Sequence, residues 1–290
     1  MNSIINHKFE KHWWGLILAL LVCIILKSCL ITTNVIPFNA DEAIVALMAR
    51  HILQGKFPVF FYGQAYMGSL DAWLIAGGFA LFGQQVWVMR LVQMLIYLGT
   101  IVTTAFLAKS VSGNWREGIV AAWLMAIPTI NVTLYTTASL GGYGEALLLG
   151  NIILLIALRI ANNIYKNNIK NGLLFGFFIG LGFWAFGYTL VYAIPALLWL
   201  VWQIIEGIKT SSLPKQTKIL EIIKLLMASI IGGLIGSMPL GLYALSNGGN
   251  ELLSELQGSA IAGVENLSYL AQIGQHLWSL LVLGSTVVFG

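Results

Sequence analysis

Two adjacent carboxylates, Asp41 and Glu42, are the residues in this sequence best suited to acid–base chemistry. They follow a short turn at residues 37–40, directly after the first long apolar segment, so we expect them at the rim of a helical bundle. A carboxylate at such a rim is partly removed from water and can act as a general base. A structural role is the alternative, because acidic residues also stabilise the positive end of a helix. The pair is therefore a candidate catalytic site.

A second acidic position, Glu145, ends the segment 135–145, which reads YTTASLGGYGE. The glycines allow the backbone to approach a ligand closely, and Glu145 would open the next helix on the same side as Asp41. These two carboxylates could share a substrate or a divalent cation, with Tyr143 beside them as a substrate contact. A tight turn with Glu145 as a helix-start charge explains the same residues. No His, Cys and Asp set has metal-ligand spacing, so this divalent cation is the one cofactor considered.

Further candidates for substrate contact lie between the first two long apolar segments. Arg50 is placed on a helix at the membrane surface, where an anionic phosphate is a plausible partner. Arg90 lies near the outer end of the second span, where it snorkels or contacts a phosphate. Tyr62 and Gln64 belong to an aromatic, glycine-rich stretch at residues 57–68 that we expect to be an ordered loop.

Other polar residues are interpreted as structural. Lys27 lies inside the first span and is predicted to snorkel, and Asp71 is predicted to start a helix. Cys23 and Cys29 point to different faces of one helix, which excludes a disulfide between them and argues against a metal site. The sequence has no Walker loop, no GxSxG and no Rossmann fingerprint. The pI near 9.0 does not indicate nucleic-acid binding, because the basic residues are scattered over short loops.

Composition defines the elements that must position these residues. Apolar residues make up 58% of the 290-residue chain and charged residues 9%, with a mean hydropathy of +0.85. A soluble domain carries roughly 25% charged residues, so this chain cannot cover a globular surface with polar groups. The sequence therefore predicts an all-α, polytopic transmembrane helical bundle that is an integral, multi-pass protein of the cell (inner) membrane.

Apolar segments long enough to cross a bilayer predict about eight spans. They cover residues 13–33, 86–108, 118–134, 145–160, 172–189, 191–205 and 222–245, with a last one starting near His276. The apolar run 69–82 is too short and is predicted to be a helix in the membrane interface. Since the last run is cut off at Gly290, we expect a single module over residues 1–290 that is truncated at its C-terminus.

Charge then orients the chain. With residues 69–82 outside the membrane core, the basic residues gather on one side and the acidic residues on the other, which predicts a cytoplasmic N-terminus. The basic set is Lys8, Lys11, Lys109, Arg116, Lys166, Lys170, Lys209, Lys215, Lys218 and Lys224, and the acidic set is Asp41, Glu42, Asp71, Glu145, Glu251, Glu255 and Glu265. The first outer loop covers residues 34–85 and holds two interfacial helices, at 41–54 and 69–82. The first helix has an apolar face of Ile44, Leu47, Met48 and Ile52.

The loop sequence NADEAIVALMARHILQGKFPVFFYGQAYMGSLDAWLIAGGFALFG, followed by VWVMRL, resembles the first outer loop of GT-C glycosyltransferases. The nearest branch is the family 39 type, which includes protein O-mannosyltransferases and lipid A aminoarabinose transferases. Its members carry an acidic motif soon after the first span and an Arg-Leu pair opening the next, matched here by Arg90 and Leu91. The later stretch GLGFWAFGYTLVYAIPALLWL is similar to paired spans of such proteins. One departure is GQAYMGSL, which stands where the family has a proline-rich stretch and leaves the acceptor open.

The resemblance implies transfer of a sugar from a polyprenyl phosphate to an acceptor on the non-cytoplasmic face. It implies Asp41 as the catalytic base and Glu42 as its partner, while Glu145 matches a second acidic position by location. We expect an inverting hexosyl or pentosyl transfer whose acceptor is a lipid, glycan or protein. Two alternatives stay open at this point: a transporter or lipid flippase, and a non-catalytic GT-C-like subunit. Nearly charge-free spans favour the enzyme over the transporter.

Overall fold

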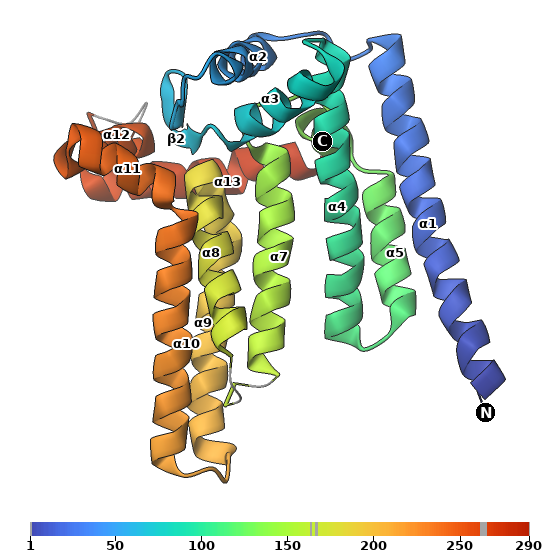
Figure 1. Ribbon diagram of the computed structural model, residues 1–290, viewed down its shortest axis with the longest axis vertical. Helices are drawn as coiled ribbons and strands as arrows, with labels where there is room; N and C mark the ends of the chain where they lie inside the picture. The colour runs from blue at the N-terminus through green and yellow to red at the C-terminus, as the bar shows by residue number, and fades with distance from the viewer. Residues whose placement is uncertain (1, 163, 166–167, 262–265, 290) are drawn as a thin grey trace.

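The computed structural model describes residues 2–162, 164–165, 168–261 and 266–289, and it is built almost entirely of helices (Figure 1). The first outer loop contains α2 (Ala40–Leu53), the hairpin β1 (Phe60–Phe61) and β2 (Gln64–Gly68), and α3 (Leu70–Phe82). The helices outside that loop are α1 (Asn2–Thr33), α4 (Val86–Ser112), α5 (Trp115–Ala126), α6 (Ile130–Tyr135), α7 (Tyr143–Ala161), α8 (Ile169–Ala185), α9 (Leu190–Thr210), α10 (Lys215–Gly236), α11 (Met238–Asn247), α12 (Gly249–Ile261) and α13 (Tyr269–Phe289), with a 3₁₀ turn η1 (Gly187–Thr189) before α9.

Five helical segments are long and apolar enough to cross a bilayer. They are Trp13–Thr33, Val86–Ser112, Tyr143–Ala161, Gly187–Thr210 and Lys215–Gly236, while Leu70–Phe82 and Ile169–Ala185 are apolar but shorter. Long helices run side by side in Figure 1, which confirms the predicted all-α transmembrane bundle. The predicted number of about eight spans stays a prediction.

Proline divides two of the predicted spans. The segment predicted at 118–134 is two helices, because α5 ends at Ala126 and α6 begins at Ile130, with Pro128 between them. The segment predicted at 222–245 likewise breaks between α10 and α11, where Pro239 occupies the first turn of α11. A proline ring clashes with the carbonyl one turn earlier and offers no N–H, so each helix ends before it and a new one starts.

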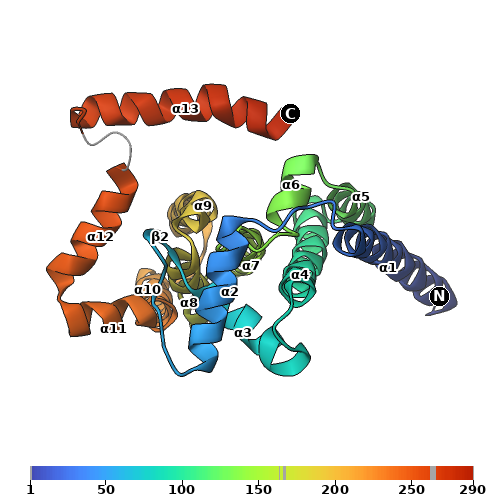
Figure 2. The ribbon, with the colours of Figure 1, turned by 90° about the horizontal axis from the view of Figure 1, so that it is seen from above.

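The first outer loop lies across one end of the bundle. Figures 1 and 2 show α2 and α3 crossing the ends of α4, α7 and α8 rather than running alongside them. Both helices agree with the predicted segments to within one residue. The Asn39 side chain caps α2 by accepting a hydrogen bond of 3.0 Å from the backbone N–H of Glu42. This cap fixes where α2 starts, and therefore where Asp41 and Glu42 point.

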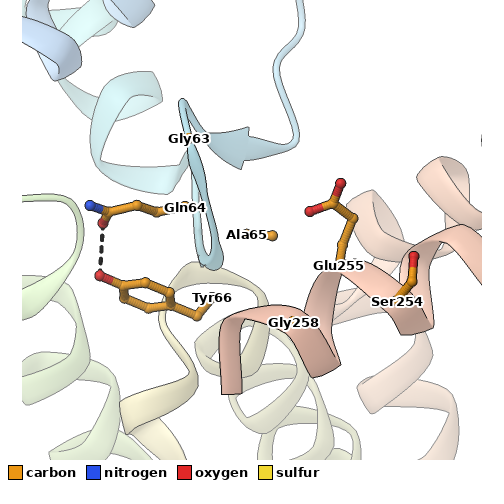
Figure 3. Close-up of a pocket in the computed structure, with 7 residues that line it drawn as sticks. All are labelled: Gly63, Gln64, Ala65, Tyr66, Ser254, Glu255 and Gly258. Atoms are coloured by element: carbon orange, nitrogen blue, oxygen red, sulfur yellow. Dashed lines mark hydrogen bonds between the residues drawn. The ribbon is translucent and has the colours of Figure 1, made fainter. Parts of the chain in front are cut away.

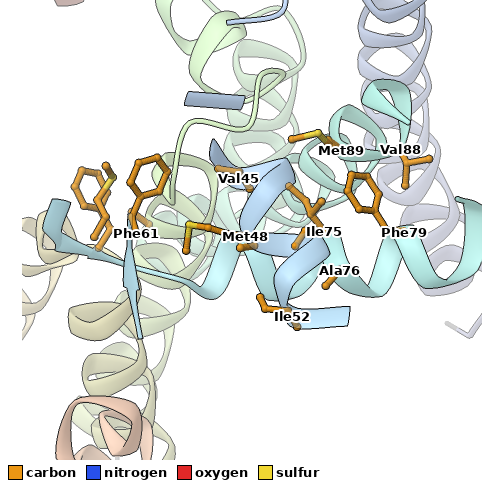
Figure 4. Close-up of a cluster of buried hydrophobic side chains, with 14 residues drawn as sticks. Val45, Met48, Ile52, Phe61, Ile75, Ala76, Phe79, Val88 and Met89 are labelled. Atoms are coloured by element: carbon orange, nitrogen blue, oxygen red, sulfur yellow. The ribbon is translucent and has the colours of Figure 1, made fainter. Parts of the chain in front are cut away.

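A hydrophobic cluster fastens α2 to the bundle (Figure 4). Val45, Met48 and Ile52 of α2 are buried against Ile75 of α3 and Met89 of α4, together with residues of the hairpin. The face predicted for this helix was partly wrong, since Met48 and Ile52 are buried but Leu47 is 44% exposed. The buried stripe runs through Val45 and Ala49 instead, because α3 and α4 cover that side.

Basic residues outnumber acidic ones at one end of the bundle, and acidic residues outnumber basic ones at the other. The N-terminus, the α4–α5 turn and the α9–α10 turn lie at the end opposite to α2, α3, α11 and α12 (Figure 1). The basic residues of the first end include Lys109, Arg116, Lys170, Lys209 and Lys215, and the acidic residues of the other include Asp41, Asp71, Glu145, Glu251 and Glu255. Lys166 and Glu265, also predicted to follow this pattern, lie outside the described residues. We call the acidic end the outer-loop end.

Glycines bring α8 and α10 into backbone contact. Gly176 and Gly180 of α8 face Gly232 and Gly236 of α10, and a Cβ added at any of them would collide with a backbone atom of the partner helix. Small residues four apart on both helices are the usual means by which membrane helices pack closely. This contact holds α8, and with it the turn at its outer end, in a fixed position.

Two neighbouring glycines of α10 provide a matched test. Gly232→Ala should destabilise the protein by at least about 1–3 kcal/mol, because its Cβ meets the Leu173 carbonyl and forces the helices apart. Gly233→Ala should leave stability unchanged or slightly higher, because the nearest atom to its Cβ lies at 3.7 Å and alanine favours the helix. Thermal unfolding of the purified variants in detergent measures both. Equal unfolding midpoints for the two variants would show that this contact does not determine stability.

Candidate active site

Asp41 is an exposed carboxylate in the first turn of α2, at the outer-loop end of the bundle. Its charge acts on the phenols of Tyr66, on β2, and Tyr143, at the start of α7. Burial, followed by the nearby Asp41 carboxylate, raises the pKa of Tyr66. Two predicted site residues, Asp41 and Tyr143, therefore lie near each other at the outer-loop end, and Tyr66 lies near both.

Aromatic rings from three outer segments form a continuous wall next to Asp41. The ring of Phe186 lies 4.8 Å from that of Tyr143, 5.9 Å from that of Tyr188 and 6.2 Å from that of Tyr66, between centroids. Tyr135 extends the wall, with its ring 4.7 Å from that of Tyr143. We call these five residues the aromatic wall. Phenols and ring faces beside an exposed carboxylate suit the binding of a polar ring-shaped ligand such as a sugar.

The hairpin is fixed against the α8–α9 junction, which keeps the wall together. Met67 of β2 forms an isolated antiparallel bridge with Phe186, and the Trp184 indole Nε1 donates to the Val59 carbonyl at 2.9 Å. Gly68 lies so close to Trp184 that a Cβ there would collide with the Trp184 carbonyl. Tyr66 and Phe186, 120 residues apart in sequence, are thus placed by backbone contacts rather than by side chains alone.

Glu42 points away from Asp41 into the protein. Its carboxylate binds the Arg90 guanidinium of α4 in two places, Nε to Oε1 at 3.1 Å and Nη2 to Oε2 at 2.9 Å. Glu42 is 0% and Arg90 2% exposed. A buried charge requires such a partner, so this pair joins α2 to α4 directly behind Asp41. The roles predicted for Glu42 in catalysis and for Arg90 in substrate binding stay predictions.

Glu145 also lies below the surface. It is 2% exposed, and its carboxyl contacts Asp71 of α3 instead of opening towards Asp41. The described residues contain no group of three or more His, Cys, Asp or Glu side chains placed to hold a metal ion. Metal binding by Asp41 and Glu145, and substrate contact by Glu145, stay predictions.

Gln64 lines a polar pocket of about 550 Å³ between the hairpin and α12 (Figure 3). The Tyr66 hydroxyl donates to the Gln64 side-chain carbonyl at 2.8 Å, which connects this pocket to the aromatic wall. Figure 3 shows the Glu255 carboxylate and Ser254 on α12, across the pocket from the hairpin. Gln64 is therefore near the candidate site, and Glu255 is an acidic residue there that was not predicted to contact substrate.

An apolar groove adjoins the other side of the hairpin. It has a volume of about 790 Å³ and is lined by four aromatic rings together with other residues of the stretch after α2 and of α11. The Phe57 and Trp73 rings stack at 5.6 Å with 9° between their planes. Its lining residues include Phe57, Val59, Trp73, Trp184, Leu242 and Tyr243.

Arg50 and Tyr62 lie away from Asp41. Arg50 is exposed in the last turn of α2, nine residues after Asp41, which is about 13 Å along a helix. The Tyr62 hydroxyl is hydrogen-bonded to Nδ1 of His51 at 2.8 Å, in that same last turn. The structure thus places these two predicted substrate contacts together, at the opposite end of α2 from Asp41.

The prediction that Lys27 snorkels is wrong. Its side chain is fully buried, and Nζ donates to the Thr136 carbonyl at 2.7 Å, the Thr136 hydroxyl at 2.9 Å and the Thr137 hydroxyl at 2.8 Å. The ammonium also lies 4.5 Å from the centre of the Tyr97 ring. These acceptors come from a segment more than 100 residues away, which a reading of the first span alone does not reveal. Lys27 therefore anchors the segment after α6 to α1.

Sequence reasoning did not assign Asp71, Gln93 or Phe186 to the candidate site or to the contacts that support it. Gln93 is a polar residue within a long apolar span, and such residues usually have a buried polar partner, which was the signal available. Asp71 was interpreted as a helix-start charge only. Phe186 offered no signal, because an aromatic residue at the end of a span is common.

Helices long enough to span a membrane and an outer loop folded across one end define an integral membrane protein. Residues 69–231, more than half of the chain, match the dolichyl-phosphate-mannose-protein mannosyltransferase family, and the chain belongs to that family. It is thus a glycosyltransferase of the membrane mannosyltransferase type, as the resemblance to family 39 predicted. The matched range includes Arg90, Tyr143 and Glu145 and begins after Asp41. No curated protein and no solved structure is significantly similar to the chain.

Proposed function

We propose that this protein transfers a hexosyl or pentosyl group from a polyprenyl phosphate to an acceptor hydroxyl or amine on the non-cytoplasmic face of the membrane, with inversion at the anomeric carbon. The observation that carries the proposal is the exposed Asp41 carboxylate beside the tyrosines of the aromatic wall. The family supports sugar transfer from a lipid-linked donor. The position of Asp41 at the outer-loop end supports the non-cytoplasmic face as the place of the reaction.

In the proposed step Asp41 acts as the general base. The acceptor oxygen or nitrogen attacks the anomeric carbon and forms the new glycosidic bond, while its proton moves to Asp41. The bond between the anomeric carbon and the phosphate oxygen breaks, and polyprenyl phosphate leaves with the bonding electrons. A double displacement would need a second carboxylate as nucleophile. Glu42 is held by Arg90, and Asp71 and Glu145 are buried, which favours a single inverting displacement. The exposed Glu255 of α12 lies across the polar pocket from the hairpin.

The leaving phosphate needs a positive partner. Of the two arginines predicted for this role, Arg90 already binds Glu42 through two nitrogens, and Arg50 lies at the opposite end of α2 from Asp41. A divalent cation bound by the exposed Asp41 would be another way to neutralise the phosphate.

The apolar groove is the proposed place for the lipid part of the donor. Its lining is almost entirely aliphatic and aromatic, as an isoprenoid chain requires. The Trp73 and Trp184 rings suit the membrane interface, where a lipid-linked sugar presents its phosphate. The Trp184 indole also holds the hairpin that bears Tyr66, so the groove and the aromatic wall share one support.

The distribution of charge supports the proposed orientation. Basic residues concentrate at the end opposite to the site, and loops rich in Lys and Arg stay in the cytoplasm. The N-terminus would then be cytoplasmic and Asp41 would face outward. Charged groups within the described spans also favour a transferase over a transporter, because Lys27 and Arg90 are bound to fixed protein partners.

The purified chain in lipid nanodiscs provides the test. We expect it to release polyprenyl phosphate from polyprenyl-phosphate mannose in the presence of a serine- and threonine-containing peptide, and to ignore nucleotide-linked mannose. Chromatography of the radiolabelled lipid and peptide follows both products. Consumption of the nucleotide-linked sugar without consumption of the lipid-linked sugar would refute the proposed donor.

A further inference from the structure

Two buried carboxyl groups meet where the first and second outer loops join the bundle. Asp71 lies in the first turn of α3 and Glu145 in the first turn of α7, and each is 2% exposed. The Gln93 side-chain amide of α4 stands between them, and its Nε2 donates to Oδ1 of Asp71 at 2.8 Å and to Oε1 of Glu145 at 3.2 Å. Three separate elements therefore contribute to one polar cluster inside an apolar environment.

The two carboxyl groups have unequal surroundings. Oδ2 of Asp71 accepts from the Ser139 hydroxyl at 2.7 Å and from the backbone N–H of Gly141 at 3.1 Å, so with Gln93 this carboxylate has three donors. Oε2 of Glu145 is buried and receives no hydrogen bond from a donor group in the described structure. Gln93 holds this carboxyl next to that of Asp71. The donors favour the charged form on Asp71 and leave the proton on Glu145.

No free cation compensates a second negative charge among the described groups around the pair. The buried ionisable side chains of the neighbouring helices already have partners: Glu42 of α2 and Arg90 of α4 bind each other, Lys27 of α1 binds Thr136 and Thr137, and the Tyr97 hydroxyl of α4 donates to the Met125 carbonyl. Tyr143, two residues before Glu145, belongs to the aromatic wall. Two adjacent buried carboxyls under these conditions cannot both ionise at neutral pH and must share one proton.

This cluster fixes the turn that carries Tyr143. The turn includes Gly141 and Gly142, with φ of 87° and 117°, a conformation that glycine tolerates. Gly141 donates to Asp71, and a Cβ there would come within 3.1 Å of Phe61 and Met67 of the hairpin. Asp71 thus holds the second outer loop against the hairpin from one side, and Glu145 holds α7 from the other. Tyr143 lies between Gly141 and Glu145 in the sequence, so its position near Asp41 depends on this arrangement.

We infer that a single proton shared by Asp71 and Glu145 keeps the second outer loop in the conformation that presents Tyr143 to Asp41, and that alkaline loss of this proton switches the enzyme off. The inference rests on the proposed function, and it makes both residues positioning residues. When the proton leaves, the two carboxylates repel each other and separate α3 from α7. The second outer loop, which these two residues hold, then loses its support.

Burial supports the direction of this pH dependence, because it raises the pKa of Asp71 above its ordinary value despite the three donors. The folded state therefore binds more protons than the unfolded chain once the pH exceeds the ordinary carboxyl pKa, near 4. Stability falls as the pH rises from that value towards the raised pKa. Once the shared proton has left, the folded protein carries the full repulsion between the Asp71 and Glu145 carboxylates.

Glu145→Gln is the decisive variant, because its amide N–H replaces the shared proton and its carbonyl still accepts from Gln93. We expect transfer at neutral pH to stay close to wild type, while the alkaline limb of the pH profile moves up by at least ~1 pH unit. Glu117→Gln, an exposed acid in the first turn of α5, is the matched control and should keep the wild-type profile. A folded Glu145→Gln variant that is inactive at every pH, or one with the wild-type alkaline limb, would overturn the inference.

A second readout does not depend on activity. The thermal unfolding midpoint of the wild-type protein should fall between neutral and alkaline pH more steeply than that of Glu145→Gln, with Glu117→Gln following the wild type. If no donor is consumed but these midpoints behave as expected, the proposed function fails and the shared proton stands. If transfer is normal and the two pH dependences of unfolding coincide, the shared proton fails and the proposed function stands.

Discussion

Asp41→Asn should lower the rate of sugar transfer by about 10²–10⁴-fold while leaving the KM for the lipid-linked donor nearly unchanged. Asparagine keeps the shape of the side chain and its place at the start of α2, but it cannot take a proton from the acceptor. The effect should therefore appear in kcat, because the base acts in the transition state and not in donor binding. Initial rates over a range of donor concentrations measure the two constants separately.

A matched control separates catalysis from helix stabilisation. Glu251 occupies the first turn of α12 as Asp41 occupies that of α2, and both are exposed at the outer-loop end. If Asp41 served only the helix dipole, its replacement would cost about 0.3–1 kcal/mol of stability and leave kcat unchanged, as we expect for Glu251→Gln. Wild-type kcat in Asp41→Asn, or an equal loss in both variants, would remove Asp41 from the mechanism.

Breaking the Glu42–Arg90 pair should have the second large effect, this time on stability. Glu42→Leu or Arg90→Met alone leaves one buried charge without its partner, which typically costs about 3–5 kcal/mol. The double variant should recover most of that loss, because two apolar side chains of similar size can replace a buried ion pair with little net cost. Thermal or denaturant unfolding of the four proteins gives the coupling energy.

Activity of the double variant then decides the role of Glu42. If the pair only fastens α2 to α4, a stable Glu42→Leu/Arg90→Met protein should transfer sugar at a substantial fraction of the wild-type rate. If Glu42 also takes part in the chemistry, as the family resemblance implies, the double variant will be folded and inactive. If the double variant lost as much stability as the two single variants together, the pairing itself would be contradicted.

The position of Asp41 was predictable because local signals fix it. Asn39 followed by two acidic residues and a helix-period apolar run is a helix-start pattern, and the structure confirms the start of α2 there. Hydropathy likewise predicted a transmembrane bundle, and the short length of 69–82 predicted a helix that lies across it. Each of these conclusions depends on residues close together in sequence.

The buried polar partners were not predictable in the same way. Arg90 lies 48 residues from Glu42, and Thr136 lies 109 residues from Lys27. Their pairing depends on which helices pack side by side, and a single sequence of mostly apolar helices does not specify those neighbours. The consequence was that Lys27 was predicted to snorkel and Asp71 to start a helix, whereas both hold distant outer segments in place.

The burial of α2 shows the same limit on a smaller scale. Helical spacing alone allowed an apolar face through Leu47 or one through Val45 and Ala49. The neighbouring α3 and α4 select the second, and this rotation turns Glu42 inward to Arg90 and leaves Asp41 exposed. The orientation that makes Asp41 available as a base is therefore a consequence of packing.

Transfer in sealed vesicles of known orientation tests the central claim most directly. The protein is reconstituted with polyprenyl-phosphate mannose in the bilayer, and an impermeant serine- and threonine-containing peptide is supplied to one side only. A cysteine at Ala65, on the hairpin, and one at Ser211, in the α9–α10 turn, identify the sides by labelling with an impermeant maleimide. We predict that the peptide is glycosylated only on the side where the Ala65 position is labelled, with release of polyprenyl phosphate. Glycosylation on the side where the Ser211 position is labelled would contradict the account.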